Sequence, residues 1–111
     1  ELRNHPNQKP EIVAPGVGII STGNNNAWYS STGTSDATVF VTAALSLLLE
    51  EHPEYKPTET SNGSCIDVIK IALMNSVEPL HETGLHDDHT GYGELRALDW
   101  ISEVTSTAPT C

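Results

Sequence analysis

The most hydrophobic stretch of the chain, residues 37–49, marks the centre of its predicted core. Ten of these thirteen residues are apolar, the other three are Thr38, Thr42 and Ser46, and none is charged. A helix that is apolar on all sides has to be buried on all sides. Because thirteen residues are too few to cross a bilayer, the pattern predicts the central helix of a globular core, which ends before Pro53.

Three short apolar runs precede this helix, and each is followed by residues that favour turns. The runs are residues 12–14, 17–22 and 28–31, and the turns are Pro15-Gly16, Gly23-Asn24-Asn25-Asn26 and the turn at Gly33. Short apolar runs between glycine and proline turns are typical of β-strands. The first third of the chain therefore predicts three strands.

Two further helices are predicted after polar loops at 56–63 and 78–93. Residues 66–75 carry apolar positions at helical spacing, and Ser64 with Asp67 resembles a capping box at their start. The apolar stripe of a last helix consists of Leu95, Ala97, Leu98, Ile101 and Val104. Short strands followed by helices favour an α/β fold.

The charge of the chain argues against nucleic acid and membrane partners. Fifteen acidic and five basic residues give the 111 residues a net charge of −10. Such a surface repels phosphate backbones and anionic lipids, and no apolar run is long enough to span a bilayer. Residues 78–103 hold seven carboxylates and one basic residue, Arg96, which we interpret as a solvated acidic face. The first residue is Glu1 and no signal-peptide pattern follows it, so we expect a processed product or an excised piece.

Two features bear on the compartment. Cys65 and Cys111 are the two cysteines, and they could pair with each other, pair with another chain or remain free. Asn62-Gly63-Ser64 is a glycosylation acceptor pattern, which makes Asn62 a candidate glycosylation site. With the apparent processing, the pattern favours a secreted or extracellular protein.

The loop near residues 81–89 offers a metal-binding alternative. It contains His81, His86, Asp87, Asp88 and His89, and imidazoles with carboxylates suit zinc while carboxylates alone suit calcium. No cysteine lies nearby, and adjacent residues rarely point at one centre without a tight loop. We therefore interpret the segment as a solvated polar loop and assign no metal ligand.

Ser35 is the candidate nucleophile. The order strand, Gly33 turn and helix places its hydroxyl at a helix N-terminus, beside backbone N–H groups without intrahelical partners. Acyl transfer needs a nucleophile next to donors that hold an oxyanion. The structural alternative is that Ser35 is only the N-cap of the helix. A nucleophile elbow with Asp87 and His89 in the order of α/β-hydrolases is disfavoured, because Ala37 replaces its last glycine and the strands are too few.

Two motifs together resemble the serine segment of the subtilisin-like proteases. Residues 9–16 read Lys-Pro-Glu-Ile-Val-Ala-Pro-Gly, similar to the Lys-Pro-Asp-Ile-Val-Ala-Pro-Gly stretch of that family. Residues 33–38 read Gly-Thr-Ser-Asp-Ala-Thr, similar to the Gly-Thr-Ser-Met-Ala-Thr-Pro signature. Residues 68–76 and 91–93 fit the family's last two helices and the glycine turn between them, so that the resemblance runs from residue 9 to about residue 101.

The resemblance implies a role and a fold. Ser35 would be the nucleophile of a serine endopeptidase, and its own backbone N–H would be one oxyanion donor. Residues 1–111 would form the C-terminal portion of a three-layer α/β domain with a parallel sheet, including strands, the buried nucleophile helix and two further helices. The triad Asp and His and the oxyanion Asn would lie upstream, in an N-terminal portion that stays associated as a separate chain. The substrate would be a peptide or protein, and the chemistry would need no cofactor, although a structural calcium ion at an unassigned site is a reasonable expectation for the family.

The chain departs from the family signature at two positions. Asp36 stands where Met is usual, and Val39 stands where Pro is usual. An anion in the first helical turn is favoured by the helix dipole, but beside a nucleophile it could stabilise an imidazolium or repel an oxyanion. Asp36 therefore supports an alternative, a catalytically inactive subtilisin-like module with a binding or scaffolding role. None of the five histidines lies in a matching motif.

Overall fold

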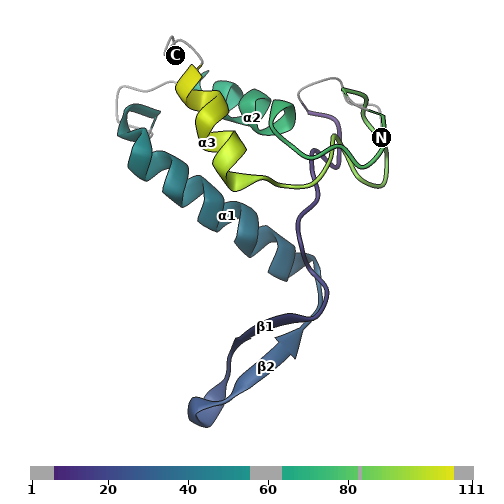
Figure 1. Cartoon of the computed structure of the whole chain (residues 1–111), viewed down its shortest axis with the longest axis vertical. Helices are drawn as coiled ribbons and strands as arrows, with labels where there is room; N and C mark the ends of the chain where they lie inside the picture. Colours follow the sequence, from purple (N-terminus) through teal and green to yellow (C-terminus); the bar gives the residue numbers. More distant parts are fainter. Residues whose placement is uncertain (1–6, 56–63, 83, 107–111) are drawn as a thin grey trace.

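Three helices and a two-stranded hairpin make up the described part of the chain. A computed structural model describes residues 7–55, 64–82 and 84–106. The helices are α1 (Thr34–Glu51), α2 (Ser64–Asn75) and α3 (Ala97–Ser106), the strands are β1 (Ile19–Thr22) and β2 (Trp28–Ser31), and the short 3₁₀ helices η1 (Asn24–Asn26) and η2 (Pro53–Tyr55) follow β1 and α1. The hairpin projects from the N-terminal end of α1, away from α2 and α3 (Figure 1).

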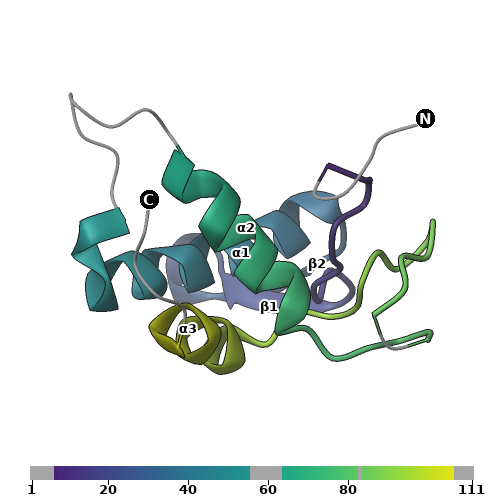
Figure 2. The same ribbon diagram turned by 90° about the horizontal axis from the view of Figure 1, so that it is seen from above.

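The core lies where the three helices meet. α3 packs against both α1 and α2 (Figure 2). The side chains of Leu48, Trp100 and Val104 are the largest that are fully buried among the described residues. The Trp100 Nε1–H donates to the backbone carbonyl of Ile69 at 3.1 Å, so the indole joins α3 to α2 without a buried unpaired donor.

The helix α1 is confirmed, but the prediction that it is buried on all sides is wrong for this chain. Along α1 only Ala44 and Leu48 are buried. Val39, Phe40 and Leu47 are 65%, 40% and 55% exposed. The physical reason is that α3, which also packs on α2, lies against one face of α1, whereas no other layer of the described residues covers the rest (Figure 1).

The strands at 17–22 and 28–31 are confirmed, and they pair with each other. β1 and β2 are antiparallel, with Ile19 opposite Ser31 and Thr22 opposite Trp28. The run at 12–14 forms a single parallel bridge, in which Val13 pairs with Glu94. The described residues thus supply a hairpin and three isolated bridges, of which this one is parallel. The parallel sheet stays a prediction about the complete protein.

The predicted last two helices are confirmed with one correction. The Ser64 side chain, half of the predicted capping box, lies outside the described residues. In α3 Leu98 is 76% exposed, so its assignment to the apolar stripe was wrong. The stripe runs through Ala97, Trp100, Ile101 and Val104. Leu98 lies about 100° around the helix from Ala97, so its side chain points away from this stripe.

Two glycines let the loop before α3 approach other parts of the backbone. Gly91 has φ +61°, and a Cβ there would lie 2.4 Å from the Glu11 carbonyl oxygen. Gly93 has φ +147°, and a Cβ there would lie 2.2 Å from the Glu78 carbonyl oxygen. The left-handed backbone and the lack of space both require glycine. Tyr92, between them, donates its N–H to the Glu11 carbonyl at 2.9 Å, which fixes the course of the segment leading to the Ser35 turn.

Candidate active site

Ser35 is the second residue of α1, and it is exposed to solvent. β2 ends at Ser31, and Gly33 occupies the N-cap position with φ 162° and ψ 167° and no side-chain capping bond. Thr34 is the first helical residue, so Ser35 lies inside the first turn. The N-cap interpretation of Ser35 is therefore wrong, and its hydroxyl is not engaged in capping this helix.

The two sequence motifs meet directly at this turn. The Gly33 N–H donates to the Gly16 carbonyl at 2.8 Å. A Cβ at Gly16 would lie 2.7 Å from the Gly33 carbonyl oxygen and 3.3 Å from the Ala37 Cβ. Since only glycine permits such an approach, Gly16 at the end of the first motif supports the turn that carries Ser35.

Two side chains at the end of the hairpin brace the same turn. The Ser31 Oγ–H donates to Asp36 Oδ2 at 2.9 Å, and this bond is partly buried. The Gly18 N–H donates to Thr32 Oγ1 at 2.9 Å. Both contacts tie the segment before Ser35 to its neighbours, and the departure Asp36 gains a structural account from its bond to Ser31.

The backbone around Ser35 suits an oxyanion. The first N–H groups of an α-helix have no intrahelical acceptor, and the helix dipole places partial positive charge at this end. The 18 residues of α1 form one continuous helix from Thr34, so Ser35 lies at the positive end of the dipole of a long helix. Among the described residues, no side chain hydrogen-bonds to the Ser35 hydroxyl.

The described histidines lie elsewhere. His52 is the C-cap of α1, and seventeen residues at 1.5 Å each put it about 25 Å along the helix from Ser35. Its Nε2 lies 2.8 Å from Thr105 Oγ1. His86 Nε2 lies 2.9 Å from the Pro10 carbonyl, and its ring packs edge-on against Tyr92 at 5.4 Å. Each of these rings has a partner within the fold and none contacts Ser35.

The loop at 81–89 is organised by Asp87. Its Oδ1 accepts the backbone N–H groups of His89 at 2.8 Å and Thr90 at 3.1 Å. These two backbone hydrogen bonds hold the pKa of Asp87 below its usual value. The carboxylate thus closes a turn of its own loop. It makes no contact with Ser35, whereas the α/β-hydrolase alternative would require Asp87 to lie near the nucleophile. Within the described residues, no three His, Cys, Asp or Glu side chains come close enough to share a metal ion.

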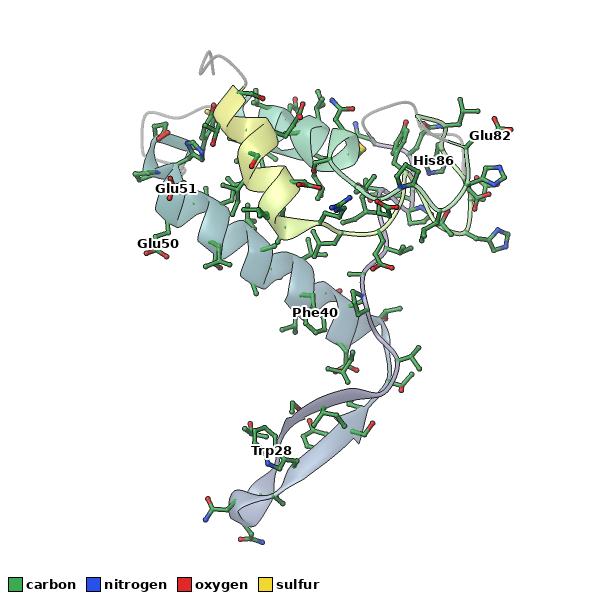
Figure 3. All side chains as sticks on the ribbon, viewed as in Figure 1. Trp28, Phe40, Glu50, Glu51, Glu82 and His86 are labelled. Atoms are coloured by element: carbon green, nitrogen blue, oxygen red, sulfur yellow. The ribbon has the colours of Figure 1, made fainter. Side chains whose placement is uncertain are left out.

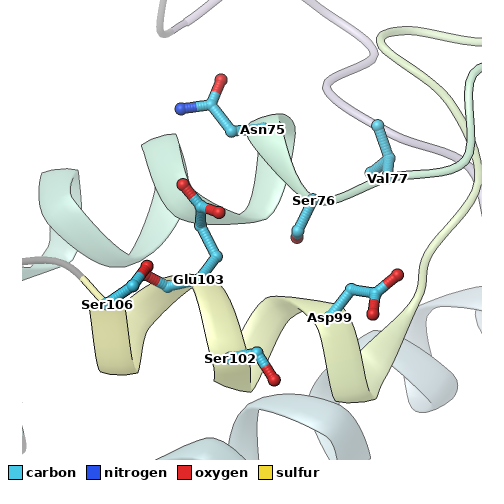
Figure 4. Close-up of a pocket in the computed structure, with 7 residues that line it drawn as sticks. All are labelled: Asn75, Ser76, Val77, Asp99, Ser102, Glu103 and Ser106. Carbon is cyan, nitrogen blue, oxygen red and sulfur yellow. The ribbon is translucent and has the colours of Figure 1, made fainter.

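A polar pocket of 450 Å³ lies between the end of α2 and α3. Asn75 comes from α2, while Asp99, Ser102 and Glu103 come from α3 (Figure 4). Asp99 already pairs with Arg96 at 2.9 Å. Because neither Ser35 nor any described histidine lines this pocket, it is separate from the candidate active site.

Other predicted features bear on the site only indirectly. Cys65 is disulfide-bonded, whereas Cys111 and the candidate glycosylation site Asn62 lie outside the described residues. No helix in the described part of the chain combines the length and hydrophobicity needed to cross a membrane.

Comparisons with known proteins decide the family. The model of the subtilase family, peptidase S8, matches residues 3–93. The chain belongs to the subtilase family. Over 80 residues this subtilase chain is 34% identical to the PII-type proteinase of Lacticaseibacillus paracasei, a match that covers 67% of the chain and 4% of that protein. It is 33% identical over 76 residues to the C5a peptidase of Streptococcus pyogenes, covering 68% of the chain and 6% of that protein.

Solved structures of subtilisin-like proteases share the fold. The Clostridium perfringens CspB protease aligns with a TM-score of 0.71 at 23% identity, over 90% of this chain and 21% of that one. The prenylagaramide maturation protease PagA aligns with a TM-score of 0.62 at 28% identity, over 87% of this chain and 34% of that one. The subtilase chain thus spans a small part of each of these relatives. It shares their fold over the aligned region, which contains Ser35.

The sequence pointed to Ser35 but not to the contacts that support it. The Gly33 bond to Gly16 joins motifs far apart in the sequence, and only the close packing of two backbones shows it. The bond between Ser31 and Asp36 depends on how the hairpin enters the helix. The signal available in advance was the presence of Asp at a position where the family usually has Met.

Proposed function

We propose that this chain supplies the nucleophile Ser35 of a subtilisin-like serine endopeptidase. The observation that carries the proposal is the placement of Ser35: an exposed hydroxyl in the first turn of an 18-residue helix, after a turn that Gly16 braces. Family membership supports peptidase chemistry in general. The assignment of the nucleophile rests on the motif around Ser35 and on this geometry.

The exposed apolar surface of α1 supports a missing second part. Val39, Phe40 and Leu47 are exposed on α1, where a helix of this composition needs cover. On the hairpin Trp28 is 72% exposed, and Figure 3 shows Trp28 and Phe40 on the side away from α2 and α3. An open gap of 290 Å³ also separates residues 12–14 from the first turns of α1.

We propose that the upstream portion of the same protease covers these surfaces as a separate chain. It would bring the parallel sheet of the three-layer domain, to which the segment around Val13 could add, since Val13 already forms a parallel bridge with Glu94. It would also bring the triad Asp and His and the oxyanion Asn. His52 and His86 are bonded elsewhere in the described fold, which is consistent with a base supplied from outside this segment.

The proposed reaction follows from this division. The upstream His takes the proton of Ser35 Oγ, and the oxygen attacks the carbonyl carbon of the scissile peptide bond. The Ser35 N–H and the upstream Asn donate to the resulting oxyanion. The C–N bond breaks as the His returns its proton to the leaving amine, and water then hydrolyses the acyl-enzyme by the same steps in reverse. No step needs a cofactor, and a structural calcium ion would act on stability alone.

The setting of the enzyme is part of the same proposal. We propose that the substrate is a peptide or protein and that the enzyme is secreted or extracellular. Its acidic surface is not expected to bind nucleic acid or membranes. The disulfide at Cys65 supports an oxidising compartment. Glycosylation at Asn62 would fit that location.

The inactive-module alternative rested on Asp36. In the structure Asp36 accepts a hydrogen bond from Ser31, so its presence has a structural reason that does not require loss of activity. This favours the enzyme over the inactive module.

Replacing Ser35 by alanine in the complete protease tests the proposal. Ser35 is exposed, and its side chain makes no hydrogen bond to the described residues. The S35A variant should therefore fold as the parent does, while its peptidase rate falls by about 10⁴-fold or more. Ser46→Ala is the matched control, since Ser46 lies in the same helix and, among the described residues, its hydroxyl bonds only to the Thr42 carbonyl at 3.0 Å. An S35A variant that retains the parent's rate would refute the assignment.

A further inference from the structure

We propose that Asp36 is a positioning residue for Ser35, which it holds in place through Ser31 while its charge favours the protonated form of the catalytic base. The inference rests on the proposed function of Ser35. It concerns the position at which this chain departs from the Met usual in the family, so the family signature does not supply it.

The geometry makes Asp36 a clamp across the turn. Asp36 lies in the first turn of α1 and Ser31 ends β2, so the 2.9 Å bond between their side chains spans the whole turn that carries Ser35. The carboxylate also lies close to Gly33, where a Cβ would be 3.7 Å from Asp36 Oδ2. Both partners of the bond are partly buried, and a charge-assisted hydrogen bond of this kind is stronger than one between neutral groups.

The clamp acts on the atom that reacts. Ser35 is bonded in sequence to Asp36, so a shift of the first helical turn moves its Oγ directly. Small displacements of a reacting atom cost large factors in rate, because the attack requires near-contact geometry. Methionine at this position could not accept a comparable hydrogen bond from the Ser31 hydroxyl, since its thioether is a weak acceptor.

The charge of Asp36 has a separate consequence. Ser31 is the polar partner that the structure records for Asp36, and none of the described Lys, Arg or His side chains pairs with it. No described cation therefore offsets the charge of Asp36 at this end of α1. The proposed upstream base has to lie within hydrogen-bond reach of Ser35 Oγ, and Asp36 is the next residue of the chain. A carboxylate at that distance would stabilise the imidazolium and raise the pH at which the base becomes active. Removing the charge should move the acidic limb of the rate profile to lower pH.

Three variants of the complete protease separate position from charge. Asp36→Asn removes the charge and keeps an oxygen that can accept the hydrogen bond from the Ser31 hydroxyl. Ser31→Ala keeps the charge and removes the bond, and Asp36→Ala removes both. The matched control is Asp67→Asn, because Asp67 is an exposed carboxylate in the first turn of α2. The measurements are kcat and KM on a peptide substrate as a function of pH, with fluorophosphonate labelling of Ser35 in the parent protease measured first.

We expect S31A and D36A to lower kcat by about tenfold with a smaller change in KM, and their combination to cost no more than either alone. D36N should retain kcat at the optimum, and in D36N and D36A the acidic limb should shift down by roughly half a pH unit, as one partly exposed charge within about 10 Å would cause. S31A and the control D67N should show no such shift.

Two results would overturn the inference. If S31A and D36A keep the parent's kcat, the bond does not position Ser35. If the acidic limb of D36N coincides with that of the parent, the charge does not act on the base. A folded parent protease that shows no label on Ser35 would overturn the proposed function and this inference with it, whereas a labelled parent with unchanged variants would overturn this inference alone.

Discussion

Two neighbouring leucines of α1 give the sharpest test of the missing layer. Leu48 is 0% exposed and belongs to the core formed by the three helices, whereas Leu47 is 55% exposed. If the upstream portion covers this face, Leu47 is a core residue of the complete protease. The substitution Leu47→Ala should then destabilise it.

The magnitude follows from the exposed fraction. Full burial of a leucine side chain contributes about 1.5–3 kcal/mol, so covering the exposed half of Leu47 contributes about 1 kcal/mol. The contacts already present and the cavity left by truncation bring the expected loss for L47A to about 2 kcal/mol. Leu48→Ala should cost about 3–4 kcal/mol, because the whole side chain is buried among its neighbours.

The free energy of unfolding should be measured by urea titration of the complete protease in an S35A background, which prevents self-digestion. Glu50→Gln serves as the surface control, since Glu50 is exposed on the same helix and its change should stay within about 0.5 kcal/mol. If L47A stays as close to the parent as this control while L48A falls as expected, no layer covers this face of α1.

Two further predictions concern the loop before α3 and Glu11, whose carbonyl that loop contacts. Gly91→Ala should lower the stability of the protease by about 2–3 kcal/mol, because its Cβ would collide with the Glu11 carbonyl and φ is positive; a melting temperature unchanged from that of the parent would contradict the close approach. Burial raises the pKa of Glu11, but hydrogen bonds from Lys70 at 2.6 Å and from Lys9 more than offset this, and the net pKa is lowered. The stability that Glu11 contributes is therefore present above its unfolded pKa and is lost as the pH falls through the lower folded pKa. Glu11→Gln should flatten the acid limb of the stability profile, and an acid limb as steep as the parent's would refute the pairing.

The sequence was sufficient for those elements whose cause is local. Residues 37–49 formed the predicted helix, and the runs at 17–22 and 28–31 formed strands, since composition and turn residues act within a few positions. The stripe of the last helix was right except at Leu98. An apolar residue on the wrong face of a short helix cannot be recognised until its neighbours in space are known.

Features that depend on distant contacts could not be predicted. The composition of α1 predicted cover on every side, but it could not show that, among the described residues, α3 packs on one face and leaves the other exposed. The approach of Gly16 to Gly33 and the bond from Ser31 to Asp36 join segments whose relative position is set by packing. Sequence therefore located the candidate nucleophile, and the structure was needed to show how its turn is held.

Covalent labelling of the complete protease tests the central claim most directly. The folded protein is treated with a fluorophosphonate probe, which reacts only with a serine activated by a base, and the modified residue is located by mass spectrometry. The account predicts a single label on Ser35, with a second polypeptide co-purifying, and no label in the S35A variant. A folded protease that carries both parts and remains unlabelled at Ser35 would contradict it.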